Sequence, residues 1–261
     1  MKICFIGGGN ISQAIIDGLL KSSLPPEEIV CIERNQEKIE LLKTQKITMA
    51  SFECLSENKF DLIILAVKPK DALAAAQKIE SLVPNSTILT VVAGIGISKY
   101  PVSASIIRSM PNTASAYNKG ITALYAEDQQ TLAFKNACSI FQRVGHIMVM
   151  ENEDDIHTFT SIIGSGQAFL FQVLNVYLTE LKSINKGNDE HAINIFQDFV
   201  SSLGDLFEQE RDFEILINKI KSPGGTTQAG LESLEKNKIE SIFKDAFRAA
   251  KERSIQISDE N

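Results

Sequence analysis

The stretch Ile3-Cys4-Phe5-Ile6-Gly7-Gly8-Gly9-Asn10-Ile11-Ser12 decides the fold of the first half of the chain. An apolar run that leads into a glycine-rich turn and then into a helical pattern is typical of a dinucleotide-binding domain. Gly7 would make the tight turn, and Gly9 would let the backbone approach a pyrophosphate. The free N–H groups of Asn10 and Ile11 would face its negative charge. Ser12 replaces the third glycine, where a small residue is enough for close packing of helix on strand.

A second glycine-rich loop, Ser222-Pro223-Gly224-Gly225-Thr226-Thr227, lies near the other end of the chain, directly before a helical pattern. The first N–H groups of a helix have no intrahelical partner, and the helix dipole favours an anion beside them. We therefore expect the first loop to hold a dinucleotide and the second loop to hold an anionic substrate.

The composition is that of a globular protein of one or two domains. Of the 261 residues, 44% are hydrophobic and 23% are charged, and the net charge of -7 argues against nucleic acid as a partner. Four scattered cysteines and three separate histidines predict a reduced, cytoplasmic chain without a metal site. No cleavable signal pattern precedes the first strand. The longest apolar stretch, around Ile88 to Ile97, is too short to span a membrane, so no membrane partner is expected.

Alternating strand and helix patterns predict a doubly wound α/β sheet with right-handed crossovers over the first part of the chain. Asn35 is placed to cap a helix over residues 35–44, and Pro69 suits the first turn of another helix. A further helix is expected over about 128–143. Strand patterns cover residues 2–6, 29–33, 47–50, 61–67, 87–93, 105–109, 121–126 and 146–150.

Only helical patterns follow Glu151. Residues 168–178 are apolar nearly all round, which predicts a helix buried on every side, and residues 191–207 carry a wide apolar stripe. This is more apolar surface than one small core needs, so we expect a homodimer or higher homo-oligomer; a compact five-helix domain is the alternative. Residues 254–261 are interpreted as a frayed polar tail. The predicted domains are residues 1–152, Rossmann-like and dinucleotide-binding, and residues 153–261, helical, dimerising and substrate-binding.

The end of the second strand bears on the choice of cofactor. Glu33 follows Gly9 at the distance where an acidic side chain would accept the ribose hydroxyls of NAD. Arg34 and Asn35 come next, and an arginine there can pair with the 2′-phosphate of NADP. The two signals conflict; we favour NADP(H), with NAD(H) as the alternative. If Arg34 does not bind a 2′-phosphate, it is a solvated surface charge.

Further cofactor contacts are expected at the carboxyl ends of later strands, where ligands bind in such sheets. Lys68 could reach a phosphate or ribose, or could be a surface lysine. Asn112 offers both a donor and an acceptor to a carboxamide, although a plain turn would use the same residue. The candidates are Ala66, Val67, Lys68, Pro69, Ala93, Gly94, Met110, Pro111 and Asn112.

Together these motifs resemble those of Δ1-pyrroline-5-carboxylate reductases over nearly the whole chain. The resemblance implies a Rossmann domain followed by a helical domain that dimerises. It also implies NAD(P)H-dependent reduction of Δ1-pyrroline-5-carboxylate to L-proline, the last step of proline biosynthesis. It is carried by the loop at Gly7, Ala66-Val67-Lys68-Pro69, Val92-Ala93-Gly94-Ile95, Arg108-Ser109-Met110-Pro111-Asn112-Thr113, Gly164-Ser165-Gly166 and Ser222-Pro223-Gly224-Gly225-Thr226-Thr227.

The resemblance also implies roles for individual residues. Hydride would pass from nicotinamide C4 to the imine carbon. The substrate carboxylate would lie on the N–H groups of Gly225, Thr226 and Thr227, with Gly164 and Ser165 also at the substrate. The Thr227 hydroxyl would touch the imine nitrogen and is the candidate catalytic group. An imine can protonate from solvent, so no histidine is needed as an acid.

Two departures from the family pattern leave other functions open. Ile163 stands where the family usually has serine, and Gln167 stands where it usually has proline. A reductase of another cyclic imine and a non-catalytic nucleotide-binding paralogue therefore remain alternatives. A β-hydroxyacid dehydrogenase is disfavoured, because that type uses a lysine early in the first helix after the domain junction. No lysine occurs here between Lys135 and Lys182.

Overall fold

The computed structural model describes residues 1–185 and 187–260. By internal packing the chain forms two compact units. The sheet unit comprises residues 1–164 together with the C-terminal residues from Ala249 onward, and the helical unit comprises residues 165–248. The predicted division into domains between residues 152 and 153 stays a prediction.

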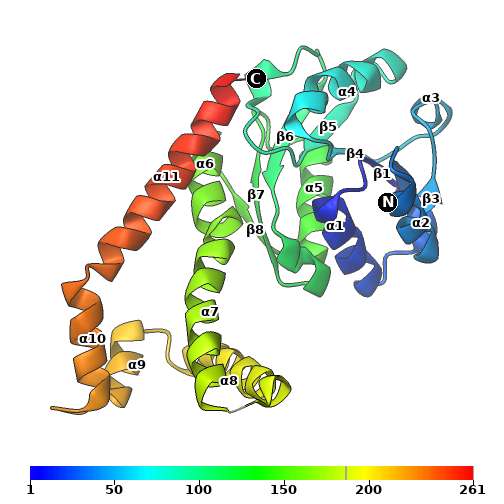
Figure 1. Ribbon diagram of the computed structural model, residues 1–261. Helices are drawn as coiled ribbons and strands as arrows, with labels where there is room; N and C mark the ends of the chain where they lie inside the picture. The colour runs from blue at the N-terminus through cyan, green and yellow to red at the C-terminus, as the bar shows by residue number, and fades with distance from the viewer. Residues whose placement is uncertain (186, 261) are drawn as a thin grey trace. The chain divides into compact units, whose positions relative to one another are not determined.

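An eight-stranded sheet in the order β3-β2-β1-β4-β5-β6-β7-β8 forms the centre of the sheet unit (Figure 1). The order 3-2-1-4-5-6 of its first six strands is that of a doubly wound dinucleotide-binding sheet. Strands β1, β2 and β4 are buried along their whole length, as expected for parallel strands covered on both faces. The strands are β1 Ile3–Ile6, β2 Ile29–Ile32, β3 Thr48–Met49, β4 Leu62–Leu65, β5 Thr87–Thr90, β6 Ser105–Met110, β7 Gly120–Tyr125 and β8 Gly145–Val149.

The doubly wound fold is confirmed, with one reversed strand that the alternating pattern did not predict. Strand β7 runs antiparallel to β6. The segment between them contains only the 3₁₀ turn η3, Thr113–Tyr117, whereas a parallel crossover needs about a dozen residues or more and usually a helix. Helix α5, Leu132–Arg143, then crosses over and places β8 parallel to β7.

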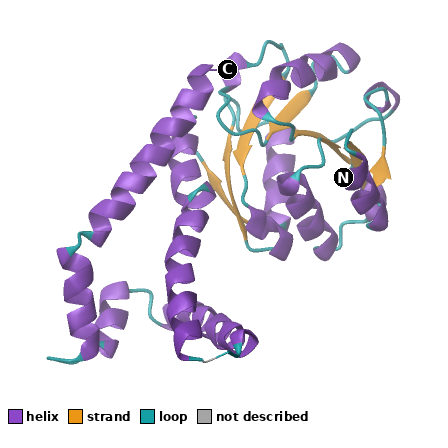
Figure 2. Cartoon of the chain, viewed as in Figure 1, coloured by secondary structure: helices purple, strands orange, loops and turns teal. Residues whose placement is uncertain are grey.

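Helices cover both faces of the sheet (Figure 2). Helices α1 (Asn10–Lys21), α2 (Gln36–Thr44) and α5 bury apolar side chains in a core on one face. Helices α3 (Cys54–Glu57) and α4 (Pro69–Leu82) do the same on the other face. The predicted cap of α2 is confirmed, because the Lys38 N–H donates to Asn35 Oδ1 at 3.1 Å. Pro69 is the first residue of α4, as predicted.

The described part of the chain after β8 contains no strand, as predicted. The expectation that residues 168–178 are buried on every side is wrong within the single chain, since Phe171 and Tyr177 are more than half exposed. Among the described residues of the helical unit, Ala192 is the only fully buried hydrophobic side chain. A compact five-helix core is therefore absent from this part of the structure. The helices are α7 Gly166–Ile184, α8 Asp189–Gln209, α9 Phe213–Ile220, α10 Thr226–Lys236 and α11 Ile239–Glu260.

The C-terminal residues form helix rather than a frayed tail. Helix α11 continues to Glu260, and its residues from Ala249 onward pack with the sheet unit. Ser254 is buried there, and its Oγ lies 2.8 Å from Nδ1 of His157 in α6, Asp155–Phe159. A polar composition predicted solvation, but a buried hydrogen-bond partner holds this serine inside.

One helical stretch, Asp155–Ile184, is long and apolar enough to cross a membrane by length and composition alone. The expectation of no membrane partner rested on the shorter stretch around Ile88 and did not include this one. One such helix is weak evidence for a membrane span, because helices that pack in a protein core pass the same test.

Candidate functional site

The first glycine loop has the geometry expected of a pyrophosphate cradle. Gly7 has a φ of +104°, and a Cβ atom added there would lie 2.5 Å from the carbonyl oxygen of Ala66, so a side chain is excluded. Gly9 caps α1, and an added Cβ would meet no described atom within 4 Å. Ser12 is fully buried and donates to the Gly7 carbonyl at 2.6 Å. Serine therefore braces the loop at the position where the usual motif has glycine.

The Glu33 carboxylate is occupied by the backbone around it. Its Oε2 accepts from Gly8 N–H at 2.8 Å, while its Oε1 accepts from Arg34 and Asn35 N–H at 2.6 and 2.9 Å. Burial raises the pKa of Glu33, but hydrogen bonds from Asn35, Gly8 and Arg34 and the charge of Lys38 bring it below its ordinary value. Glu33 is thus an ionised carboxylate that ties the glycine loop to the end of β2.

Arg34 extends into solvent beside this carboxylate. Its side chain is 88% exposed, and its single ion pair, with Asp71, is long at 3.7 Å. An exposed pair of this kind contributes about 0–1 kcal/mol at most, so the guanidinium can turn to another anion at little cost.

The remaining predicted cofactor residues end β4, β5 and β6 at the same edge of the sheet. Lys68 and Ala93 are exposed there, and Ala66, Val67 and Pro69 are half-buried. Met110, Pro111 and Asn112 are buried. The carboxamide oxygen of Asn112 accepts from Ile121 N–H at 3.0 Å, so this end of its side chain holds the start of β7.

A buried ion pair under the same edge was not selected from the sequence. Arg108 on β6 is 1% exposed and donates to Glu153 at 2.8 Å. The same carboxylate oxygen of Glu153 accepts from Ile97 N–H at 2.7 Å. Among the described residues, Arg108 Nε and Nη2 have no partner. One arginine inside the otherwise uncharged strand pattern of residues 105–110 was the available signal, because a buried charge requires a partner.

The second glycine loop opens helix α10. Gly225 caps the helix, and no described side chain caps its first turn, so the N–H groups of Thr226 and Thr227 face outward. The Gly225 N–H donates to Ser222 O at 2.9 Å, and the Gly224 N–H donates to Gln228 Oε1 at 2.9 Å. These two bonds fold the loop back on its helix and leave the first turn open for an anion.

Of the predicted substrate residues, Gly164 ends a π-helical turn, Thr160–Gly164, and Ser165 follows it as the cap of α7. Side-chain hydroxyls promote this irregularity, because Thr160 Oγ1 donates to Ile156 O at 2.6 Å and competes with the backbone ladder. Ile163 packs against a small cluster that includes Met110. The departure at residue 163 therefore supplies an apolar contact to the end of β6.

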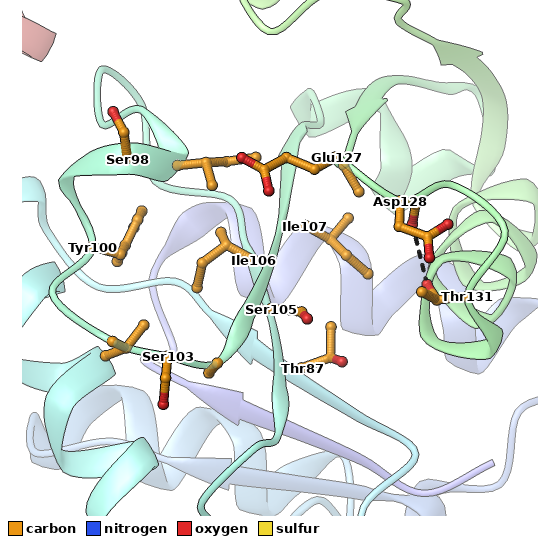
Figure 3. Close-up of a pocket in the computed structure, with 14 residues that line it drawn as sticks. Thr87, Ser98, Tyr100, Ser103, Ser105, Ile106, Ile107, Glu127, Asp128 and Thr131 are labelled. Atoms are coloured by element: carbon orange, nitrogen blue, oxygen red, sulfur yellow. Dashed lines mark hydrogen bonds between the residues drawn. The ribbon is translucent and has the colours of Figure 1, made fainter.

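A pocket of about 430 Å³ lies at the opposite edge of the sheet (Figure 3). Thr87 and Ser105, which begin β5 and β6, line it together with Glu127 and Asp128 after β7. None of the predicted cofactor or substrate residues lines it. Because ligands of open α/β sheets bind outside the carboxyl ends of the strands, this pocket is not the candidate site. Among the described residues, no group of three or more His, Cys, Asp or Glu side chains could hold a metal ion.

The strand order and the glycine loop define a Rossmann-like dinucleotide-binding protein. A family profile described as "Pyrroline-5-carboxylate reductase dimerisation" matches residues 153–257, and one described as "NADP oxidoreductase coenzyme F420-dependent" matches residues 2–94. Pyrroline-5-carboxylate reductase 1 of Bacillus subtilis is 31% identical, over 99% of this chain and 90% of its own length. The chain belongs to the pyrroline-5-carboxylate reductase family, and it is an oxidoreductase.

Other relatives agree over the full length. The pyrroline-5-carboxylate reductase of Pasteurella multocida is 28% identical, over 98% of this chain and 97% of its own. The crystal structure of the Coxiella burnetii enzyme superimposes with a TM-score of 0.85 at 25% identity, covering 98% of both chains. That of the Plasmodium falciparum enzyme, which has NADP bound, gives 0.85 at 23% identity, over 99% and 98%. The match to the dimerisation profile also supports a homo-oligomer.

Proposed function

We propose that this protein reduces Δ1-pyrroline-5-carboxylate to L-proline with NAD(P)H as donor, the last step of proline biosynthesis. The observation that carries the proposal is the family membership, which extends over both glycine loops. We further propose that it works in the cytoplasm as a homodimer or a larger homo-oligomer.

The fit of the dinucleotide rests on the first loop. Gly9 leaves open space where any side chain would stand, and the first turn of α1 has no side-chain cap among the described residues. Gly7, Gly9, Asn10 and Ile11 would hold the pyrophosphate. When bound, NAD(P)H supplies the hydride that reduces the imine carbon. The proposed contacts on either side come from Glu33, Arg34, Asn35, Ala66, Val67, Lys68, Pro69, Ala93, Gly94, Met110, Pro111 and Asn112.

For the substrate, the open first turn of α10 is the proposed carboxylate site. Thr226 and Thr227 would donate their N–H groups, an arrangement worth about 0.3–1 kcal/mol when exposed and up to about 2 kcal/mol when partly buried. The Gly225 N–H already donates to Ser222 O, so Gly225 would contribute a close approach of the backbone rather than a donor. The Thr227 hydroxyl would hold the imine nitrogen, and Gly164 and Ser165 would contact the ring. Solvent would protonate the imine nitrogen before hydride reaches the imine carbon, so no side chain is required as an acid.

NADP(H) is the proposed cofactor. Glu33 already accepts three backbone N–H groups, which leaves little of its capacity for ribose hydroxyls. Arg34 is exposed and weakly paired, as a ligand of a 2′-phosphate should be before binding. We expect Arg34→Ala to raise KM for NADPH about tenfold and to leave KM for NADH unchanged. The neighbouring Lys38→Ala is the control, and equal effects on both nucleotides would contradict the assignment.

The proposal is tested by following nicotinamide oxidation with pyrroline-5-carboxylate and, in parallel, with the six-membered piperideine-2-carboxylate. Turnover of the five-membered imine at the higher kcat/KM supports the proposal. Preference for the six-membered ring would favour the alternative of another cyclic-imine reductase, which the departure from the family pattern at Ile163 left open. Binding of NADPH without turnover of either imine would indicate a non-catalytic paralogue.

A further inference from the structure

The last two turns of α11 pack on the loop that follows β5. Ser254, Ile257 and Ser258 are spaced three and four residues apart and so lie on one face of the helix. Ser254 Oγ lies 2.8 Å from His157 Nδ1, which fixes this face to the sheet unit. Ile257 contacts Gly94, and Ser258 Oγ is 3.7 Å from the position of a Cβ added to Gly96.

Ile257 fills the space where residue 94 would otherwise have a side chain. Gly94 has a φ of +74°, and a Cβ atom added there would overlap Cγ2 of Ile257. Gly94 is buried while the preceding Ala93 is exposed, so Ile257 packs on one side of the loop and leaves the other side open.

Among the described residues, hydrogen bonds hold the two ends of the loop but not its middle. At the first end, Thr90 Oγ1 lies 2.8 Å from the Tyr100 hydroxyl and accepts from Val92 N–H at 3.2 Å. At the other end, Ile97 N–H donates to Glu153. Within the described chain, no hydrogen bond holds the N–H groups of Ala93, Gly94 or Ile95. Packing therefore restrains the middle of the loop: the Ile95 side chain is buried in the core of the sheet unit, and Ile257 covers Gly94.

This loop belongs to one half of the dinucleotide site, an assignment that rests on the proposed function. The end of β2 receives the adenosine ribose in such folds. Because β2 and β4 flank β1, and β5 lies beyond β4, a dinucleotide that crosses the glycine loop extends its other half toward β5. Residues 93–96 therefore lie beside the nicotinamide half.

We propose that Ile257 is a positioning residue for cofactor binding: by packing on Gly94 it orders the loop against which the nicotinamide half binds. The C-terminal helix thus completes the cofactor cradle of its own chain. A loop that is ordered only part of the time reduces the apparent affinity by the fraction of ordered molecules. Loss of Ile257 should act on the nicotinamide half alone.

The test compares two ligands that share the adenosine half. NADPH contains both halves, whereas 2′,5′-ADP contains only the adenosine and its phosphates. We expect Ile257→Ala to raise the Kd of NADPH about fivefold and to leave the Kd of 2′,5′-ADP within about twofold. Ile257→Val should restore most of the affinity for NADPH. Ile255→Ala, at a neighbouring and more exposed position of the same helix, is the control and should change neither constant.

An equal rise in the Kd of both ligands in Ile257→Ala would indicate a general loosening of the sheet unit and would overturn the proposal. Unchanged Kd values for both ligands would also overturn it. Should Ile257→Ala not fold, Ile257→Val decides, since a selective, smaller weakening of NADPH is expected there. The binding constants are measured without an imine. A wild type that binds NADPH without reducing any imine would therefore refute the proposed function, while the binding comparison would still decide the role of Ile257. A wild type that binds no nicotinamide nucleotide would refute both.

Discussion

The two units of the molecule differ in how far their apolar side chains are buried within one chain. In the sheet unit, Ile3 on β1 and Ile15 on α1 are fully buried within one chain. In the helical unit, Phe199 and Leu203 on α8 are 43% and 46% exposed. The sheet closes its own core because helices cover both faces. The helices of the other unit leave their stripes uncovered within one chain, and the match to a dimerisation profile supports a homo-oligomer.

This difference separates two kinds of stability. The sheet unit should unfold at a temperature independent of protein concentration, because its core is complete. The helical unit should become more stable as concentration rises, because folding and association of its exposed helices are linked.

The largest effect is expected from a charge in the exposed stripe of α8. Leu203→Asp would bury a carboxylate in the interface between copies, at a cost above about 3 kcal/mol. Dimer affinity should fall at least about 100-fold, while NADPH binding by the sheet unit persists. Light scattering measures the assembly, and nucleotide fluorescence measures binding. The control Asp198→Asn, also exposed on α8, should remain dimeric. A dimeric Leu203→Asp protein would place the interface elsewhere.

Substitution of two glycines in the first loop should have different effects, on stability at Gly7 and on nucleotide affinity at Gly9. Gly7→Ala forces a side chain against Ala66 O at a positive φ and should lower the free energy of unfolding by about 2–3 kcal/mol. Gly9→Ala meets open space, so its stability should stay within about 0.5 kcal/mol, while its Kd for NADPH rises about tenfold. Thermal unfolding and nucleotide titration distinguish them. Equal loss of stability in both variants would contradict the geometry of the loop.

The third prediction concerns the helical unit. Thr227→Ala should reduce kcat/KM for the imine about tenfold without abolishing it, because the backbone donors and solvent protonation remain. Thr227→Ser keeps the hydroxyl and should retain most activity, and Thr226→Ala is the positional control. A folded Thr227→Ala protein with no detectable turnover would make this hydroxyl essential.

The smallest effect is a dependence of stability on pH in the sheet unit. Burial, with the charge of Arg108, holds the pKa of His157 below its ordinary value of 6.5 despite opposing effects of Asp154 and Glu153. The unfolded chain therefore takes up the proton first, and the stabilisation is present above the ordinary pKa and lost as the pH falls below it. The unfolding temperature should fall between about pH 7.5 and about pH 5.5 in the wild type, and less in His157→Gln. Equal slopes would show that another group is responsible.

Sequence patterns were sufficient for most of the sheet unit, because its central strands β1, β2 and β4 are buried apolar runs and local signals such as Asn35 mark the start of a helix. Sequence patterns were insufficient where the structure depends on contacts with residues distant in sequence or with another copy of the chain. The apolar surface of residues 168–178 predicted burial on every side, which is wrong within the single chain, because no pattern distinguishes burial in the same chain from burial against another copy. Nor did alternation reveal that β7 is reversed, although the short connection before it was a signal.

The sequence predicted the shape of the first glycine loop but not the contacts around it. Gly7 and Gly9 have the geometry that their spacing predicts, and Arg34 is exposed with a long ion pair to Asp71. The carboxamide oxygen of Asn112 accepts from Ile121 N–H, a contact that the sequence did not indicate. The contact between Ile257 and Gly94 joins residues too distant in sequence for any local pattern. The roles of the cofactor and substrate residues stay predictions until ligands are bound.

The packing of α11 on the sheet unit has a consequence for the order in which the protein matures. A ribosome releases the glycine loop and the loop after β5 well before the residues from Ala249 onward, so the loop after β5 receives its cover only after those residues emerge. A nascent chain should therefore acquire its Rossmann-like fold before it can bind both halves of the dinucleotide. A premature stop ahead of Ile257 would leave a protein that folds yet binds the reactive end of the dinucleotide poorly.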